Sequence, residues 1–315
     1  MMRTECAAWL SCHDDFCILT HRRPDGDTLG SAAGLCRILR QAGKTAHVLE
    51  NPDVTDRLSF LPEGLTKPEA GENDTILCVD VASPGILQKN AEHLLSRCAL
   101  RIDHHATATS FTPNELVDAG AGACGEIIYD IAEELGQKLT KEAAEALYVA
   151  VSTDTGCFRF ANTTDHTFLV AAACAAAGAE IYRLNQLLFE TNTLSKLRMR
   201  SWIVENLQLF ADGTMAIVAI PRAVEDLLGV TEDDMDNISS FPRTVAGVEM
   251  AATLRQTKDG QTKLSLRAVP GLDAAAVCAR FGGGGHKGAA GATMALPLEE
   301  AAFAVKEAML TTERK

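Results

Sequence analysis

The sequence lacks several features that mark common protein classes. Its ten cysteines form no Cys-x-x-Cys pair, which excludes a zinc ribbon or a thioredoxin-like redox motif. No apolar run approaches the roughly 18 residues of a membrane span, and residues 1–20 have no basic start before an apolar stretch. We therefore expect a cytoplasmic protein with reduced, mostly buried cysteines and no membrane partner.

Positive charge is also scarce. The chain has 29 Lys and Arg against 42 Asp and Glu, a formal net charge of −13. Two bound divalent cations would add +4 and leave −9, still acidic. Binding to long duplex nucleic acid relies on basic faces, so we do not expect that partner. A short anionic substrate held by metal ions in one pocket agrees with this composition.

The length of 315 residues exceeds the size at which a single core stops growing, so we expect two domains. In the first half, apolar runs alternate with helical patterns, which predicts an α/β fold with a parallel sheet flanked by helices. The second half predicts a smaller α+β domain. We place a catalytic domain at 1–185, a helical connector at 186–210 and a substrate-binding domain at 211–315.

The expected elements follow from these patterns. In the first half the expected strands are 16–20, 45–50, 75–80, 99–103 and 115–118, and the expected helices are 28–42, 84–96, 123–135, 141–151 and 164–177. A long polar helix over 183–205 is expected to connect the domains. The second half then has expected strands at 215–220, 245–254 and 263–268, and helices at 223–228, 274–281 and 298–309.

Aspartates and histidines gather where the apolar runs of the first domain end. Because the carboxyl ends of parallel strands meet at one edge of a sheet, we expect these side chains to converge. Taken singly, Asp-Gly-Asp is a common polar turn, and Asp80 or Asp154 could simply end an element. Paired histidines at a strand end have few structural uses, however, and imidazole is the commonest metal ligand. The residues that predict a dinuclear metal site are His21, Asp25, Asp27, Asp80, those of the Asp103-His104-His105 segment, and Asp154.

The ligand types in this set suit divalent cations. The four negative charges of Asp25, Asp27, Asp80 and Asp154 would balance two divalent cations. Two metal ions about 3.5–4 Å apart activate water and grip a phosphoryl oxygen in hydrolytic sites. Mixed carboxylate and imidazole ligation favours Mn²⁺, with Mg²⁺, Co²⁺ or Zn²⁺ as alternatives, whereas Ca²⁺ prefers oxygen ligands alone.

The second domain carries groups that suit an anionic substrate. They lie in Lys263-Leu-Ser265-Leu-Arg267 and in Phe281-Gly-Gly-Gly-Gly285-His286. Consecutive glycines let backbone N–H groups approach an anion closely. The Gly-Lys-Ser/Thr of a Walker loop is absent, and the glycines follow a predicted helix, which does not fit a dinucleotide fingerprint. A flexible linker is the alternative explanation, and His286 makes it the weaker one.

These motifs resemble the DHH superfamily of phosphoesterases, in its two-domain form with a DHH-associated C-terminal domain. The closest likeness is to the bacterial nanoRNase and pAp phosphatase group. The resemblance covers nearly the whole chain and is carried by the order of six motifs. They are His21-x-x-x-Asp25-x-Asp27, Val-Asp80, Asp103-His104-His105, Thr-Asp154-Thr-Gly-x-Phe-Arg159-Phe, Ser265-Leu-Arg267 and Gly-Gly-Gly-Gly-His286.

The resemblance implies a role for each matching position. His21 and Asp25 would bind the first metal ion, Asp27, His104 and Asp154 the second, and Asp80 would bridge the two. His105 would contact the scissile phosphate, while Asp103 would orient a histidine from behind. The other phosphate or the base would be held in a cleft between the domains by Arg267, Gly283, Gly284, Gly285 and His286. Arg159 is a weaker candidate there, since a structural salt bridge would explain it equally well.

We therefore expect a Mn²⁺-dependent phosphohydrolase in which a hydroxide bridging two metal ions attacks a phosphoester. Its substrates would be short oligonucleotides, pAp, or linear dinucleotides such as pApA or pGpG. A pyrophosphatase or short-polyphosphate hydrolase is one alternative, and a non-catalytic nucleotide sensor is another. The sequence does not separate phosphatase from diesterase activity, and it leaves open whether the chain forms a homodimer.

Overall fold

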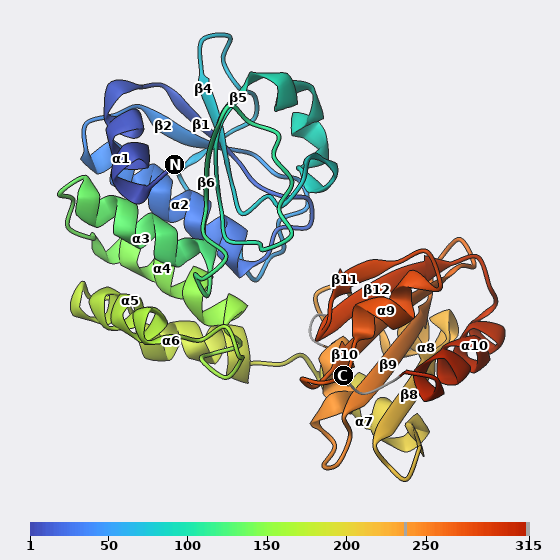
Figure 1. Ribbon diagram of the computed structural model, residues 1–315. Helices are drawn as coiled ribbons and strands as arrows, with labels where there is room; N and C mark the ends of the chain where they lie inside the picture. Colours follow the sequence, from blue (N-terminus) through green and yellow to red (C-terminus); the bar gives the residue numbers. More distant parts are fainter. Residues whose placement is uncertain (236–237, 313–315) are drawn as a thin grey trace. The chain divides into compact units, whose positions relative to one another are not determined.

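The computed structural model describes residues 1–235 and 238–312, and the chain divides into two compact units, Met1–Thr191 and Asn192–Lys315 (Figure 1). Among the described residues, no single helix is long and apolar enough to cross a membrane. One pair of helical segments, Asp165–Ala176 and Ile181–Glu190, passes that test only when the two are joined, and the pair is bent by 120°.

The first unit is built on a six-stranded parallel sheet, which confirms the expected α/β fold. The strand order β3-β2-β1-β4-β5-β6 reverses direction between β1 and β4. In such sheets the crevice at the carboxyl ends of the strands beside the reversal is where ligands bind. The strands are β1 Phe16–Leu19, β2 Ala46–Leu49, β3 Thr66–Lys67, β4 Thr75–Val79, β5 Cys98–Asp103 and β6 Asn114–Val117.

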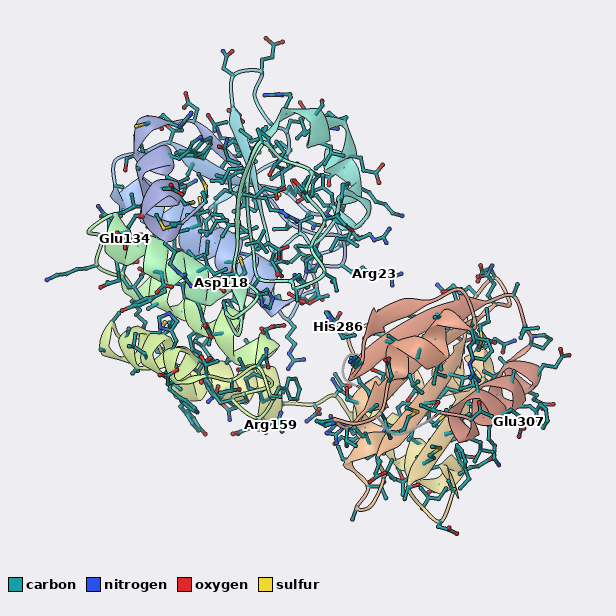
Figure 2. All side chains as sticks on the ribbon, viewed as in Figure 1. Arg23, Asp118, Glu134, Arg159, His286 and Glu307 are labelled. Atoms are coloured by element: carbon teal, nitrogen blue, oxygen red, sulfur yellow. The ribbon has the colours of Figure 1, made fainter. Side chains whose placement is uncertain are left out.

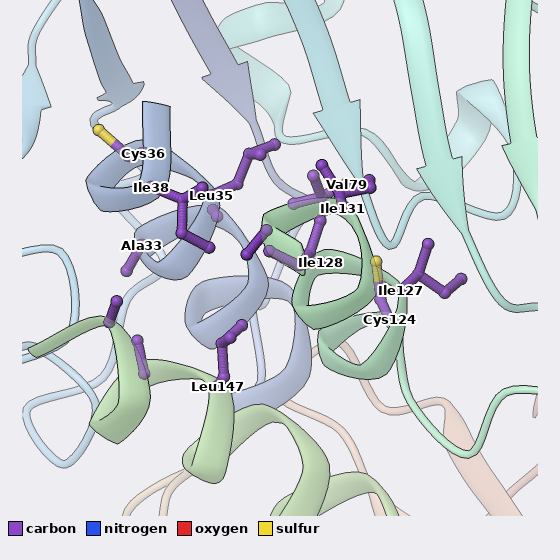
Figure 3. Packing of buried hydrophobic residues seen from close by; sticks show 14 of the residues in the cluster. Ala33, Leu35, Cys36, Ile38, Val79, Cys124, Ile127, Ile128, Ile131 and Leu147 are labelled. Carbon is purple, nitrogen blue, oxygen red and sulfur yellow. The ribbon is translucent and has the colours of Figure 1, made fainter. Parts of the chain in front are cut away.

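Helices cover one face of this sheet. Helices α2 and α3 pack on the strands, and α4 packs on both helices (Figure 3). Alternate residues of each strand face this layer, as Phe16 and Ile18 do, because side chains alternate between the faces of a strand. The helices of the unit are α1 Arg3–Cys12, α2 Gly26–Gln41, α3 Cys124–Glu134, α4 Lys141–Asp154, α5 Asp165–Ala176 and α6 Ile181–Asn185.

Two 3₁₀ segments, η1 Pro84–Ile86 and η2 Lys89–Arg97, lie where we expected one α-helix over 84–96. The interruption falls at Gln88, whose backbone is extended. Its side-chain oxygen accepts a hydrogen bond from the backbone N–H of Thr20 at 2.9 Å, and its amide donates to the carbonyl of Glu50 at 3.1 Å. Satisfying the buried N–H of Thr20, together with the carbonyl of Glu50, therefore takes precedence over helix continuity.

Close packing of α2 against α4 depends on Gly30. A Cβ atom at this position would lie 2.4 Å from the carbonyl oxygen of Ala146 and 2.9 Å from the backbone nitrogen of Ala150. We expect Gly30→Ala to lower the free energy of unfolding of the first unit by about 1–3 kcal/mol, because overpacking outweighs the better helix propensity of alanine. Urea unfolding followed by Trp9 fluorescence in a Trp202→Phe background measures this unit alone.

The matched control is Gly85→Ala, since a Cβ atom at Gly85 would meet nothing within 4 Å. This variant should unfold within about 0.5 kcal/mol of the parent. Equal stability of the two alanine variants would show that α2 and α4 separate without cost.

The second unit has a mixed six-stranded sheet of order β11-β12-β10-β9-β8-β7, which confirms the expected smaller α+β domain. Only β8 and β9 run parallel among its described neighbours. One face packs on α9 and α10 through residues such as Leu264 and Leu266. The strands are β7 Gln208–Phe210, β8 Met215–Ile220, β9 Met250–Gln256, β10 Thr262–Ala268, β11 Gly284–His286 and β12 Ala289–Met294. The helices are α7 Leu194–Asn206, α8 Arg222–Leu228, 3₁₀ segment η4 Ile238–Thr244, α9 Ala274–Ala279 and α10 Leu298–Leu310.

The single long helix expected over 183–205 is wrong. The chain forms α6, a π-helical turn η3 over Gln186–Glu190, and then α7. The break has a local cause, because Thr193 is extended and its hydroxyl caps α7 by accepting from the backbone N–H of Lys196 at 3.0 Å. Helix α7 buries Met199 and Ile203 among residues of the second unit.

Candidate metal centre

The candidate ligands lie at the carboxyl ends of β1, β4 and β5, at the start of α2 and at the end of α4. His21 follows β1, Asp80 follows β4, and His104 follows β5. Asp25 caps α2, its carboxylate accepting from the backbone N–H groups of Asp27 at 3.0 Å and Thr28 at 3.1 Å. The reversal of strand order and the capping of α2 thus bring these residues to one place.

The carboxylate of Asp80 lies between two groups of ligands. On one side, Nε2 of His21 is 3.6 Å from Oδ2 of Asp80 and 3.6 Å from Oδ1 of Asp25. On the other side, Nε2 of His104 is 3.5 Å from Oδ1 of Asp80. The same nitrogen is 3.5 Å from Oδ2 of Asp27 and 3.7 Å from Oδ2 of Asp154. Each oxygen of Asp80 therefore faces a different group of candidate metal ligands.

These residues fit a pair of divalent cations. Oδ1 of Asp80 is buried and receives no hydrogen bond, an expensive state for a carboxylate unless a cation lies against it. Burial, together with the charge of Asp27, raises the pKa of Asp154 to about 7. Burial and the charge of Asp80 likewise raise the pKa of Asp27. A cluster of like charges that repel each other is stabilised when cations replace the protons.

Backbone groups fix the orientation of Asp27. Its carboxylate accepts hydrogen bonds from the N–H groups of Cys124 at 2.7 Å and Gly125 at 3.0 Å, at the N-terminus of α3. The hydroxyl of Ser31 donates to the same group at 3.0 Å. A helix N-terminus stabilises a buried negative charge, so one oxygen of Asp27 is held toward His104.

His105 and Asp103 form a separate pair beside the cluster. Nδ1 of His105 donates to Oδ1 of Asp103 at 2.8 Å, and the backbone N–H of His104 donates to the same oxygen at 2.8 Å. Asp103 is fully buried, and Arg101 lies 3.7 Å from its other oxygen. Burial opposes ionisation most strongly, but the hydrogen bonds from His105 and the positive charges of His105 and Arg101 together outweigh it and lower the pKa of Asp103. The carboxylate therefore fixes the ring of His105 with Nδ1 as the donor.

A pocket of about 550 Å³ opens on the cluster, and its lining shows basic residues that sequence reasoning missed. Arg22, Arg23 and Lys89 line it together with His21, Asp80, His105 and Asp154. Arg23 is labelled in Figure 2. Arg22 and Arg23 are the two residues after His21 in the sequence. Their position beside a predicted ligand could therefore have indicated that they line the site. Lys89 comes from η2, and a β-bridge between His21 and Leu87 brings that segment to the loop.

Arg159 lies in the turn after α4 (Figure 2). Its Nε donates to the carbonyl of Gly156 at 2.5 Å, and among the described residues it forms no ion pair. Arg159 is not among the residues that line the pocket beside the Asp80 cluster. Its assignment to substrate binding stays a prediction.

Arg267 of β10 and His286 of β11 lie in one row of the second sheet, because both pair with Ala289 of β12. Residues paired in this way project from the same face, roughly 10 Å apart across two strand spacings. The guanidinium of Arg267 donates to the hydroxyls of Ser239 at 3.3 Å and Ser240 at 3.2 Å. Within residues 1–235 and 238–312, no carboxylate forms an ion pair with Arg267. The row therefore presents a cation that lacks a negative partner of its own.

Part of the glycine run forms a strand, which does not fit the flexible linker given as the alternative explanation. Gly284 and Gly285 belong to β11, and Gly284 pairs with Gly291. A Cβ atom at Gly283 would lie 2.2 Å from the carbonyl oxygen of Gly291, and one at Gly285 would lie 2.6 Å from that of Ala289. Glycine is needed here because β11 approaches β12 so closely. The run sets the position of His286 at the end of the strand.

Residues 15–151 match the DHH family N-terminal domain, and residues 219–311 match the DHHA1 domain. The chain is 32% identical over 298 residues to the bifunctional oligoribonuclease and PAP phosphatase NrnA of Thermus thermophilus, covering 93% of this chain and 88% of that protein. The chain belongs to the DHH family. This confirms the resemblance drawn from the motifs.

Three further proteins are similar to this chain at lower sequence identity. The NrnA of Bacillus subtilis is 27% identical over 297 residues, which are 93% of each chain. The cyclic-di-AMP phosphodiesterase PdeA of Listeria monocytogenes is 25% identical over 295 residues, 87% of this chain and 44% of that protein. The fold matches the crystal structure of an exopolyphosphatase-related protein from Bacteroides fragilis with a TM-score of 0.89 at 21% identity, covering 98% and 95% of the chains.

Proposed function

We propose that this protein is a divalent-metal-dependent phosphoesterase that hydrolyses short nucleotides. The substrates would be oligoribonucleotides of a few residues, pAp, and linear dinucleotides such as pApA or pGpG. The names of the relatives NrnA and PdeA support this substrate class. The observation that carries the proposal is Asp80, whose two oxygens face separate sets of carboxylates and imidazoles. The ten free cysteines agree with a cytoplasmic setting.

The residues divide between two cations. His21 and Asp25 would hold one, Asp27, His104 and Asp154 the other, and Asp80 both. Bound cations, for which this mixture of oxygen and nitrogen favours Mn²⁺, supply the Lewis acidity that activates water and stabilises charge on a phosphoryl group. Four aspartates balance the charge of two such ions, so the phosphate needs other positive groups. Arg22, Arg23 and Lys89 of the pocket lining provide them.

His105 would contact the phosphate, and Asp103 would position it. The hydrogen bond to Asp103 raises the pKa of His105, which favours a protonated ring that donates from Nε2 as well as from Nδ1. His105 lines the pocket, so its Nε2 is the atom available to a phosphate oxygen.

Asp103→Asn should lower kcat by about 10- to 100-fold with little change in KM, as expected for a carboxylate that orients a functional imidazole. Steady-state kinetics at saturating Mn²⁺, combined with the metal content per chain, measure this. The control is Asp118→Asn, since Asp118 follows the neighbouring strand and pairs with Arg3 instead. If Asp103→Asn lost its metal ions, Asp103 would act through the ligands and not through His105.

The function is tested by product analysis on a panel in Mn²⁺ buffer: pAp, pApA, pGpG, a long RNA and pyrophosphate. We expect release of phosphate from pAp and of mononucleotides from the dinucleotides, with the long RNA cut far more slowly. Turnover of pyrophosphate alone would favour an inorganic pyrophosphatase. Binding of pApA without any product would make the protein a sensor.

A further inference from the structure

Three further candidate ligands lie at the opposite end of the first sheet. Cys17 is the second residue of β1 and His47 the second residue of β2, and the two are direct cross-strand partners. Asp74 immediately precedes β4, whose Ile76 also pairs with Cys17. One ligand atom from each of Cys17, His47 and Asp74 lies within 4.8 Å of the other two. The strands therefore bring a thiol, an imidazole and a carboxylate together.

His47 has no hydrogen-bond partner in this position. It is 1% exposed, and neither ring nitrogen takes part in a hydrogen bond. Nε2 of His47 lies 3.3 Å from Oδ2 of Asp74. A buried imidazole without a hydrogen bond is unusual, since roughly 90% of buried polar groups have a partner. A ligand that approaches the ring nitrogen would account for it.

We propose that Cys17, His47 and Asp74 form a second metal site that binds Zn²⁺. Thiolate, imidazole and carboxylate are the ligands of zinc, and a thiolate with a carboxylate balances its charge. Two ligand atoms bound at about 2.0–2.1 Å in a tetrahedron lie roughly 3.4 Å apart, close to the observed separation of His47 and Asp74. The fourth position would be open to water on the side of Asp74, which is partly exposed.

The sulfur ligand separates this site chemically from the cluster around Asp80. Oxygen and nitrogen ligands accept Mn²⁺ and Mg²⁺, whereas a thiolate selects softer ions. The two sites are also apart in space, because Cys17 and His21 are separated by four residues of extended chain, about 13 Å. A cation at Cys17 would join the amino ends of β1, β2 and β4. Two of these strands lead to His21 and Asp80, so the zinc site would stiffen the strands that carry those ligands.

The test uses Co²⁺ as a probe in protein freed of metal by dialysis against a chelator. Thiolate bound to Co²⁺ gives a near-ultraviolet charge-transfer absorption, and the cluster around Asp80 contains no cysteine. With excess Mn²⁺ present to occupy the cluster around Asp80, we expect the band to saturate at about one equivalent of Co²⁺ per chain and to be displaced by Zn²⁺. The band should persist in Asp80→Asn, so its presence does not depend on the function proposed for the other site.

Two cysteine variants locate the thiolate. Cys17→Ser should remove the band, and Cys98→Ala should keep it. Cys98 is a matched control, since it is buried in the same row of the sheet, paired with Ile76, and its sulfur contacts Cys78 at 3.7 Å. His47→Gln should weaken Co²⁺ binding at least tenfold, which absorbance titration measures.

Thermal unfolding gives a second readout. Zn²⁺ should raise the unfolding midpoint of Asp80→Asn, and the rise should vanish when Cys17→Ser is added. The proposal is overturned if the folded wild-type protein shows no charge-transfer band. It is equally overturned if the band survives in Cys17→Ser, or if Cys98→Ala removes it, because Co²⁺ would then sit elsewhere.

Discussion

Asp80→Asn is expected to lower kcat for pApA by about a thousandfold or more, because the variant loses the carboxylate that faces both ligand sets. A thousandfold loss corresponds to about 4 kcal/mol of transition-state stabilisation, the size of effect expected when one or both cations are lost. Metal analysis should show fewer Mn²⁺ ions bound per chain than in the wild type. Steady-state kinetics at saturating Mn²⁺ give the rate.

Asparagine is a better replacement for Asp80 than alanine, because the backbone at residue 80 has a φ of 57°. Asparagine and aspartate tolerate this left-handed region better than alanine, so Asp80→Asn changes charge without straining the chain. A matched control is Asp53→Asn, an exposed aspartate that lines the same pocket outside the ligand cluster. It should keep kcat within about threefold of the wild type.

Measurements on Asp80→Asn without metal distinguish loss of function from loss of the folded structure. Burial raises the pKa of Asp80 above its ordinary value, so the ionised carboxylate destabilises the metal-free folded protein, increasingly as pH rises through that pKa. Metal-free Asp80→Asn should therefore unfold at the same temperature as the metal-free wild type or higher. Mn²⁺ at a hundred times its Kd should stabilise the wild type by about 2.7 kcal/mol and the variant much less.

A variant with wild-type kcat and full metal content would overturn the assignment of Asp80 as the shared ligand. A variant that unfolds at a lower temperature without metal would instead show that Asp80 holds the fold together. Calorimetry with and without Mn²⁺ distinguishes the two outcomes.

The sequence predicted the first unit well because its strands are short apolar runs that end in polar residues. The runs before Asp80 and Asp103 are buried in the parallel sheet, and the reversal of strand order brings their ends together. The pairing of His21 with Asp25 and Asp80 follows from this topology alone. Ligands of this kind can be predicted once the ends of the strands are known, and the apolar runs in the sequence show where the strands end.

Other features depend on contacts that no local pattern contains. Strands β11 and β12 consist largely of glycine and alanine, which have low β propensity, and they form because each pairs with a neighbour. Gln88 interrupts a helical pattern because it satisfies backbone groups of Thr20 and Glu50, which directly follow β1 and β2. The cluster of Cys17, His47 and Asp74 requires the register between three strands, so its members read as ordinary interior residues.

Arg267→Ala is expected to lower kcat/KM for pApA by about a hundredfold while leaving a small artificial phosphodiester, bis(p-nitrophenyl) phosphate, nearly unaffected. The loss corresponds to about 2.7 kcal/mol, the size of one charge-assisted hydrogen bond to a phosphate group. Arg267 is suited to this role because serine hydroxyls hold its guanidinium. Burial lowers its pKa, so a partly desolvated cation is available for an anionic group.

The two substrates separate substrate recognition from chemistry. Bis(p-nitrophenyl) phosphate carries the reacting phosphate but neither a second phosphate nor a nucleoside, so it needs only the cluster around Asp80. His286→Ala should show the same selectivity with a smaller loss, since His286 lies in the same row but is exposed. Lys258→Ala is the control and should leave both substrates unaffected, because Lys258 is an exposed basic residue in the turn between β9 and β10.

Equal losses for both substrates in Arg267→Ala would show that the arginine supports the fold of the second unit instead of binding the nucleotide. Far-ultraviolet circular dichroism and the unfolding transition of Trp202 report that outcome directly. Selective loss for pApA would instead mean that the second unit supplies nucleotide affinity and the first unit the chemistry. The row of Arg267, Ala289 and His286 would then be the part of the protein that decides which phosphoesters are cleaved.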